Sequence, residues 1–294
     1  MEGLGFGPAL AIGRGRLPVW PVFDFTGGAL PWGASLTRSS AGTRFDAAGH
    51  LVNEAANVAR FDHDRATGAL RGLLIEPART NLCPNANADP ADTSGVSAFG
   101  GGMVSVASDA AAIAAAGLGV LAAGGKAYKL DNSAAGSASS FAVTGATTSS
   151  ACVGSAWLRG SGGAAIGFSA GTASMATTAL TADYTRYIST ITPSGSGYFR
   201  VTVAAGAVMW LLLDQLEAGT SETTPIVTTG AAATRAADVL TLDWASRGVA
   251  DGTITARVTF DDLSTQDVTM AVAGGLATVP VTLTRRRVRA IARL

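Results

Sequence analysis

The chain has 294 residues, of which 48% are hydrophobic and 14% charged, and its mean hydropathy is +0.31. This composition excludes an intrinsically disordered chain, and the length is enough for about two domains that need no disulfide or metal to fold. Lys plus Arg and Asp plus Glu number 21 each, so the formal net charge of zero argues against a protein that coats nucleic acid or binds anionic lipid.

Residues 1–33 have a high density of Gly and Pro and also contain aromatic side chains, among them Trp20, Phe23, Phe25 and Trp32. The segment is too interrupted for regular structure and too apolar for a solvated tail, so we expect it to become ordered only against a partner protein. It does not fit a signal peptide. The longest apolar run, 110–125, is too short for a membrane-spanning helix. We therefore expect synthesis in the cytoplasm and no membrane insertion.

Two small β-hairpins are predicted in residues 1–81. Asp-Ala-Ala-Gly at 46–49 fits a type I turn between strands at 43–45 and 50–52. A second hairpin is expected around the turn at 64–68. We treat residues 1–81 as one N-terminal region.

Residues 82–240 form the next predicted unit. Short runs of Ser, Thr, Ala and Val, such as 140–144, 151–158 and 199–203, are separated by Gly clusters. Short strands at this spacing indicate an antiparallel sandwich or jelly roll, with one short helix at 109–116. The fold class is therefore all-β.

Residues 241–294 are predicted to form a small β module with strands at 252–260, 266–272 and 277–283. An acidic set precedes an arginine-rich end: Asp251, Asp261, Asp262 and Asp267, then Arg285, Arg286, Arg287, Arg289 and Arg293. Like charges at this density repel one another, so we expect ion pairs with the acids, within the chain or across subunits. Direct contact with an acidic polysaccharide is the alternative.

The motifs that suggest catalysis are incomplete. Gly-Phe-Ser-Ala-Gly at 167–171 matches a serine-hydrolase elbow, but both histidines, His50 and His63, precede the serine. Asp261 and Asp262 are adjacent and so point to opposite sides of a strand, which does not suit a pair of catalytic carboxylates. We expect no enzyme.

No sequence pattern predicts a metal centre either. Cys83 and Cys152 are far apart and have no neighbouring histidine, so we expect free thiols. The acidic cluster at 62–64 fits a turn better than a metal site, because consecutive residues rarely converge on one ion.

Aromatic side chains of the middle unit are the better functional signal, because sugar rings stack on aromatic faces. The candidates are Tyr128, Trp157, Tyr184, Tyr187, Tyr198 and Trp210. Strand alternation places Tyr198 and Arg200 on an exposed face, opposite Phe199 and Val201 in the core. We predict carbohydrate contacts for Tyr198, Arg200, Tyr184 and Trp157, although core packing is the more common role of any single aromatic residue.

Several runs resemble virion tail-fibre or head-spike proteins of tailed phages and gene transfer agents, which carry a jelly roll like a carbohydrate-binding module. The runs are LTRSSAGTRFDAAGHLV (36–52), ANVARFDHD (56–64), GLLIEPARTNL (72–82), DQLEAGTSETTPIVTTGAAATRAAD (214–238), GTITARVTFDDLSTQDV (252–268) and VPVTLTRRRVRAI (279–291). The family pattern after Gln-Leu-Glu differs from Ser221–Ile226 here. Residues 83–213 match by pattern only.

The resemblance implies a virion structural protein that binds polysaccharide on the host surface, with residues 1–81 as its particle-attachment region. Its expected partners are capsid, portal or baseplate proteins and further copies of itself, and its expected location is the particle surface. We expect the protein to need no cofactor. Some carbohydrate-binding jelly rolls hold a structural calcium, for which Asp214 and Glu217 are the candidate ligands here. The alternatives are a connector that binds no glycan and a capsule depolymerase.

Overall fold

The computed structural model describes residues 22–143, 150–160, 165–170, 173–174, 178–191 and 199–294. Within these ranges the chain is built almost entirely of antiparallel strands, which confirms the predicted all-β class. None of the helices among the described residues is long and apolar enough to cross a membrane.

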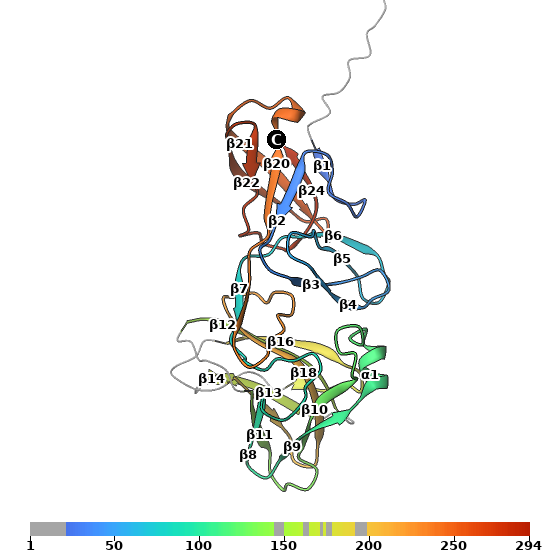
Figure 1. Cartoon of the computed structure of the whole chain (residues 1–294). Coiled ribbons are helices and arrows are strands. Elements are labelled where there is room, and N and C mark those ends of the chain that lie inside the picture. The colour runs from blue at the N-terminus through green and yellow to red at the C-terminus, as the bar shows by residue number, and fades with distance from the viewer. Residues whose placement is uncertain (1–21, 144–149, 161–164, 171–172, 175–177, 192–198) are drawn as a thin grey trace, which may run out of the picture.

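The middle of the chain forms two facing sheets (Figure 1). The first has, in spatial order, β16 (Thr185–Ile191), β12 (Cys152–Gly160), β18 (Val208–Ala218), β10 (Lys126–Asp131) and β9 (Met103–Ser108). The second has β14 (Ala173–Ser174), β13 (Ala165–Ala170), β17 (Phe199–Val203), β11 (Ser139–Val143) and β8 (Val96–Phe99), with β15 (Thr178–Ala179) also paired to β13. From β10 to β18 the chain alternates between the sheets except at β14 and β15, which is the strand order of a jelly roll.

The core of the jelly roll lies between these sheets. Phe199, Val201 and Val203 of β17 have no exposed surface, in agreement with the predicted alternation. They face Leu211 and Met209 of β18 within one apolar cluster. Successive residues of a strand point to opposite faces, so Trp210 of β18 lies on the outer side of the first sheet.

The predicted helix is confirmed as α1 (Ala110–Ala115), and it lies against the outer side of the first sheet. Ile113 of α1 is fully buried with Leu212 of β18. Leu51, from the first hairpin, belongs to the same cluster. Helix and hairpin therefore cover part of this sheet.

Both predicted hairpins are confirmed. β3 (Gly42–Phe45) pairs with β4 (Leu51–Glu54), and β5 (Phe61–His63) pairs with β6 (Leu70–Leu74). Their turns pack closely: a Cβ at Gly49 would lie 2.4 Å from the Arg65 carbonyl oxygen, and Gly49 has a φ of +78°. Glycine is the residue that suits both that close approach and that conformation.

The two ends of the chain share one sheet, whose described strands run β22 (Thr265–Val272), β21 (Gly252–Phe260), β24 (Arg287–Arg293), β6 and β5, with β1 (Val22–Asp24) also paired to β24. A smaller sheet contains β2 (Ala34–Thr37), β20 (Val239–Asp243) and β23 (Leu276–Thr278), and β7 (Arg79–Asn81) pairs with β19 (Ala233–Arg235). A short 3₁₀ helix covers Ala245–Arg247. We call β1, β2 and β20 to β24 together the terminal module. Figure 1 shows it at one end, with the hairpin strands between it and the jelly roll.

The expectation that residues 1–33 order only against another protein is wrong for β1. Phe23 and Phe25 have no exposed surface, and Phe23 packs edge-on against Trp244 with 5.0 Å between ring centroids. Residues 1–21 lie outside the described ranges. Two strand predictions also differ: the strand expected at 277–283 is limited to β23, and the arginine-rich end forms β24.

A cluster of buried charges joins the hairpins to the connector after β18. We define the arginine cluster as Arg38, Arg60, Arg235, Glu76 and Asp238, whose side chains are at most 1% exposed. Arg60 contacts Glu76 at 2.8 Å and Asp238 at 2.6 Å. Arg38 and Arg235 contact Asp238 and Glu76 at 2.9 and 2.6 Å.

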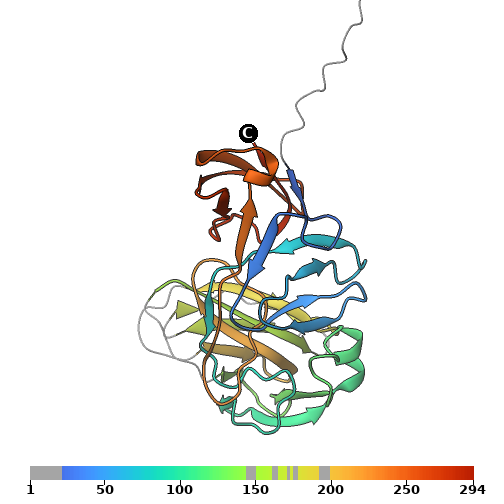
Figure 2. The same cartoon turned by 45° about the horizontal axis from the view of Figure 1, so that its top comes forward.

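The arginine cluster explains why four of the quoted runs occur together. Each of the runs 36–52, 56–64, 72–82 and 214–238 supplies at least one of its members. Figure 2 shows the first hairpin, drawn in blue, beside the jelly roll, and its Leu51 is buried in a cluster with jelly-roll residues. Burial alone would raise the pKa of Glu76, but three arginines hold that pKa well below its usual value: Arg235, Arg60 and Arg286. The members of the arginine cluster therefore have a structural role, because their charges pair with one another inside the protein.

Candidate functional site

An exposed row of polar and aromatic side chains crosses the outer side of the first jelly-roll sheet. Trp210 of β18 lies opposite Lys129 of β10 on one side and opposite Arg159 of β12 on the other. Ser105 of β9 extends the row beyond Lys129. We call Ser105, Lys129, Trp210 and Arg159 the tryptophan face. All four are partly or fully exposed, whereas Leu211, the next residue of β18, is buried in the core.

The guanidinium group of Arg159 is held against two aromatic rings. It lies 5.0 Å from the centroid of Trp210 and 5.7 Å from that of Tyr184. Asp109, which precedes α1, accepts a hydrogen bond from Arg159 Nε at 2.6 Å and a second from Nη2. Hydrogen bonding to Asp109 raises the pKa of Arg159. The cation is therefore fixed beside the indole ring of Trp210.

Lys129 supplies a second cation on the other side of Trp210. Its ammonium group lies 2.9 Å from Asp131, whose pKa is lowered to about 2 by hydrogen bonds from Ser133 and Lys129. The tryptophan face thus combines an aromatic ring, two cations, a hydroxyl and carboxylates at its edge. Such a set can stack on the apolar face of a sugar and bond its hydroxyl groups.

The structure places the predicted residues Trp157 and Tyr184 inside the protein, with exposed fractions of 3% and 1%. The Trp157 ring meets Phe45 edge-on at 6.1 Å, and the Arg65 guanidinium lies 5.3 Å from its centroid. Because protein side chains cover both rings, a glycan has no access to them in this arrangement. They support Arg65 and Arg159 instead.

Arg200 lies on the outer side of the opposite sheet, as alternation along β17 predicts. It is partly exposed and lies opposite Ala142 of β11. In the next row the Thr202 and Ser140 hydroxyls are 3.4 Å apart. Tyr198 falls outside the described residues. A binding role for Arg200 stays a prediction, and its position on the other sheet separates it from Trp210.

The two candidate calcium ligands do not come together. Asp214 is 1% exposed, and burial raises the pKa of its carboxyl group to about 6. Glu217 accepts hydrogen bonds from the backbone N–H and hydroxyl of Thr223, both at 2.7 Å. The residues lie three apart on β18, which turns them to opposite faces. Among the described residues no group of three or more His, Cys, Asp or Glu side chains is placed to hold a metal ion, and a structural calcium at Asp214 or Glu217 stays a prediction.

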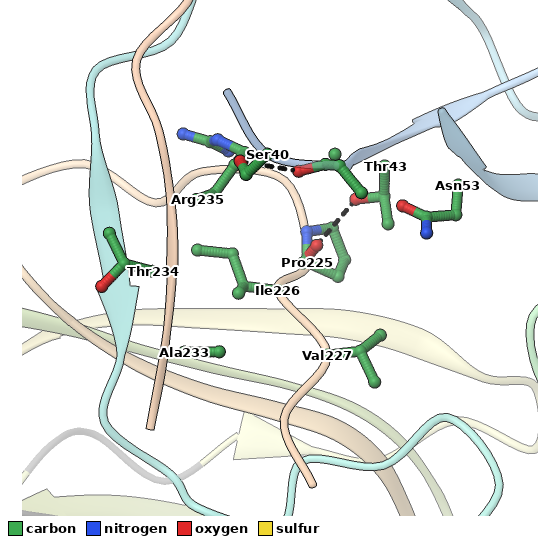
Figure 3. A pocket seen from close by; sticks show the side chains of 11 residues that line it. Ser40, Thr43, Asn53, Pro225, Ile226, Val227, Ala233, Thr234 and Arg235 are labelled. Atoms are coloured by element: carbon green, nitrogen blue, oxygen red, sulfur yellow. Dashed lines mark hydrogen bonds between the residues drawn. The ribbon is translucent and has the colours of Figure 1, made fainter. Parts of the chain in front are cut away.

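A small crevice lies between the first hairpin and the connector after β18 (Figure 3). Its volume is about 200 Å³, below the range of about 300 to 1,000 Å³ that is typical of ligand pockets. The Thr43 hydroxyl on its wall donates to the Pro225 carbonyl at 2.8 Å, and the Ser40 hydroxyl accepts from Ala236 N. These polar groups hydrogen-bond the first hairpin to the connector. The crevice is therefore a structural contact between these two segments.

The sequence contains only part of the signal for the tryptophan face. Alternation along 208–212 places Trp210 opposite to Leu211, and Trp210 is among the aromatic candidates. Its neighbours Lys129 and Arg159 come from strands 50 or more positions away, and their pairing is not a local property of the sequence.

Comparison with models of known families gives no match, and no curated protein matches the sequence significantly.

Proposed function

We propose that the chain is a surface protein of a phage-like particle, a head spike or tail fibre, that binds polysaccharide on a host cell through its jelly roll. The observation that carries the binding part is the row Lys129, Trp210 and Arg159, whose side chains are partly exposed on one sheet face. A flat aromatic ring between two fixed cations is suited to stacking with a sugar and to hydrogen bonds with its hydroxyl or acidic groups.

The attachment part of the proposal rests on the resemblance of the quoted runs to virion proteins. In this view the terminal module and hairpins contact capsid, portal or baseplate proteins, and the arginine cluster fixes the jelly roll relative to them. Single carbohydrate sites are weak, so several copies in one particle would provide the required avidity.

Two experiments test the proposal. The full chain, presented on multivalent beads, is expected to retain a subset of bacterial capsular polysaccharides on an array and to release no new reducing ends from them. Absence of binding on a broad array would support a connector without glycan affinity, and release of reducing ends would support a depolymerase. Labelling this chain in purified particles is expected to place it on the outer surface; a position inside the particle contradicts the attachment role.

A further inference from the structure

A second crevice opens where the second hairpin, the terminal module and the end of α1 meet. Its volume is about 450 Å³, within the size range of small-ligand sites. The lining side chains that matter here are Phe45, His63, Asp64, Arg65, Arg71 and Arg287. We call this site the junction crevice. Sites for small ligands often lie at such meetings of structural units.

Two arginines of the junction crevice are held in place by hydrogen bonds to carboxylates. Arg71 Nε donates to Asp261 at 2.9 Å, and Arg287 Nε donates to Asp62 at 2.5 Å. Their side chains remain 33% and 22% exposed. The guanidinium groups are thus held in place while part of each faces solvent.

Arg65 supplies the cation that is not neutralised. Among the residues that the structure describes, no carboxylate forms an ion pair with it, and its guanidinium rests on Trp157. Its Nη1 donates to the Tyr184 carbonyl at 3.3 Å. A planar guanidinium supported in this way is preorganised to bind a carboxylate through two parallel hydrogen bonds.

The remaining lining residues suit a sugar ring better than a bare anion. Asp64 uses its Oδ1 to accept hydrogen bonds from Ala66 and Thr67, so its charge is committed to its own turn. His63 Nδ1 lies 3.2 Å from the Phe45 carbonyl, and a proton on Nδ1 leaves Nε2 to accept from a hydroxyl. The partly exposed ring of Phe45 offers an apolar surface.

Tyr184 connects the junction crevice with the tryptophan face. Its carbonyl accepts from Arg65, and its ring contacts the guanidinium of Arg159. The two sites are therefore neighbours on the outer side of the first jelly-roll sheet, where Trp157 under Arg65 is two residues from Arg159 on β12.

We propose that the junction crevice binds a carboxylate-bearing sugar residue, with the carboxylate on Arg65 and the sugar ring beside Phe45. The inference rests on the proposed function for the claim that this sugar belongs to a polysaccharide. It extends that function by naming the ligand class as acidic.

The test titrates the full chain with glucuronate, glucose and inorganic phosphate, with binding followed by calorimetry or ligand-observed NMR. We expect glucuronate to bind about tenfold or more tightly than glucose or phosphate. Equal affinity for glucuronate and glucose contradicts a carboxylate site. Phosphate binding as tight as that of glucuronate contradicts a sugar site.

Variants locate the binding. Arg65→Gln is expected to weaken glucuronate binding by about tenfold or more. Arg44→Gln, which changes an arginine paired with Glu54 on the first hairpin, is the matched control and is expected to leave the affinity within about twofold. The thermal midpoint of each variant checks that it folds. Arg65→Lys keeps the positive charge but lacks the planar guanidinium that can donate two parallel hydrogen bonds, so it should retain only part of the affinity.

Trp210→Ala separates this inference from the proposed function. It should lower the affinity for glucuronate less than Arg65→Gln does, because the proposed carboxylate contact is with Arg65 and not with Trp210. Loss of glucuronate binding in Trp210→Ala with normal binding in Arg65→Gln overturns the junction site. Glucuronate binding without any polysaccharide binding refutes the proposed function and leaves the crevice as a site for free acidic sugars.

Discussion

The guanidinium group of Arg60 lies 2.6 Å from the carboxylate of Asp238, although 178 positions separate the two residues in the chain. Glu76 contacts the same guanidinium, and all three side chains have no exposed surface. Charges that are buried in this way must be paired, because desolvation of an unpaired ion costs several kcal/mol. The contact fixes the connector after β18 against the hairpins, and so fixes the orientation of the jelly roll.

Removing the charge of Glu76 should therefore be costly. Glu76→Gln leaves Arg60, Arg235 and Arg286 short of a counter-charge, and we expect the free energy of unfolding to fall by about 3 to 5 kcal/mol. Urea denaturation followed by tryptophan fluorescence measures this. Asp267→Asn breaks an exposed pair with Arg257 and is the control, with little expected change. Equal effects of the two substitutions would contradict a structural role for the arginine cluster.

Asp214 should make stability depend on pH in the opposite direction to Glu76. Burial raises the pKa of Asp214 to about 6 from a usual value of 3.8, so the folded state holds the proton more tightly. Its contribution favours folding at pH 4 and is lost as the pH rises through 6, an effect of about 3 kcal/mol.

Asp214→Asn removes this titration. The stability of the variant relative to the unmodified protein should increase between pH 4 and pH 8, as measured by urea denaturation at a series of pH values. A difference that is constant across this range would show that Asp214 does not hold a proton in the folded state. Glu76, whose pKa is lowered, contributes stability that is lost at acidic pH instead.

Both cysteine thiols should be inert in the native protein. Cys83 and Cys152 have no exposed surface, and burial raises the pKa of each thiol. We expect no reaction with a thiol reagent at pH 8 before unfolding and reaction of both thiols in denaturant. Rapid labelling of the folded chain would show that the segment around one of these cysteines opens readily.

Local patterns were sufficient for the elements whose ends are set by turn chemistry. Asp46 and Gly49 predict the first hairpin, and alternation along 199–203 predicts which side of β17 is buried. The pairing of β1 with β24 depends on residues at opposite ends of the chain, so neither segment shows it alone. The same applies to the tryptophan face, which exists only because β10 and β12 flank β18.

Charge was the least informative local signal. The arginines at 285–293 fit either ion pairs or contact with an acidic polysaccharide, and Val288 and Ile291 between them are buried in β24. Arg285, Arg286 and Arg287 each pair with a carboxylate of the same chain. This agrees with the predicted ion pairs, of which those of Arg285 with Asp261 and Asp262 use predicted partners. Only the folded arrangement identifies Glu76 and Asp62 as the partners of Arg286 and Arg287.

The central claim is that the jelly roll binds glycan through Trp210. The most direct test is the affinity of the full chain for the capsular polysaccharide that it binds best, measured by surface plasmon resonance for Trp210→Ala and for Trp32→Ala. Trp32 is 72% exposed and lies outside the jelly roll, so it is a matched control. We expect Trp210→Ala to lose about fivefold or more in affinity per site with an unchanged thermal midpoint, and Trp32→Ala to bind normally. Normal binding by Trp210→Ala, or an equal loss in both variants, would contradict the claim.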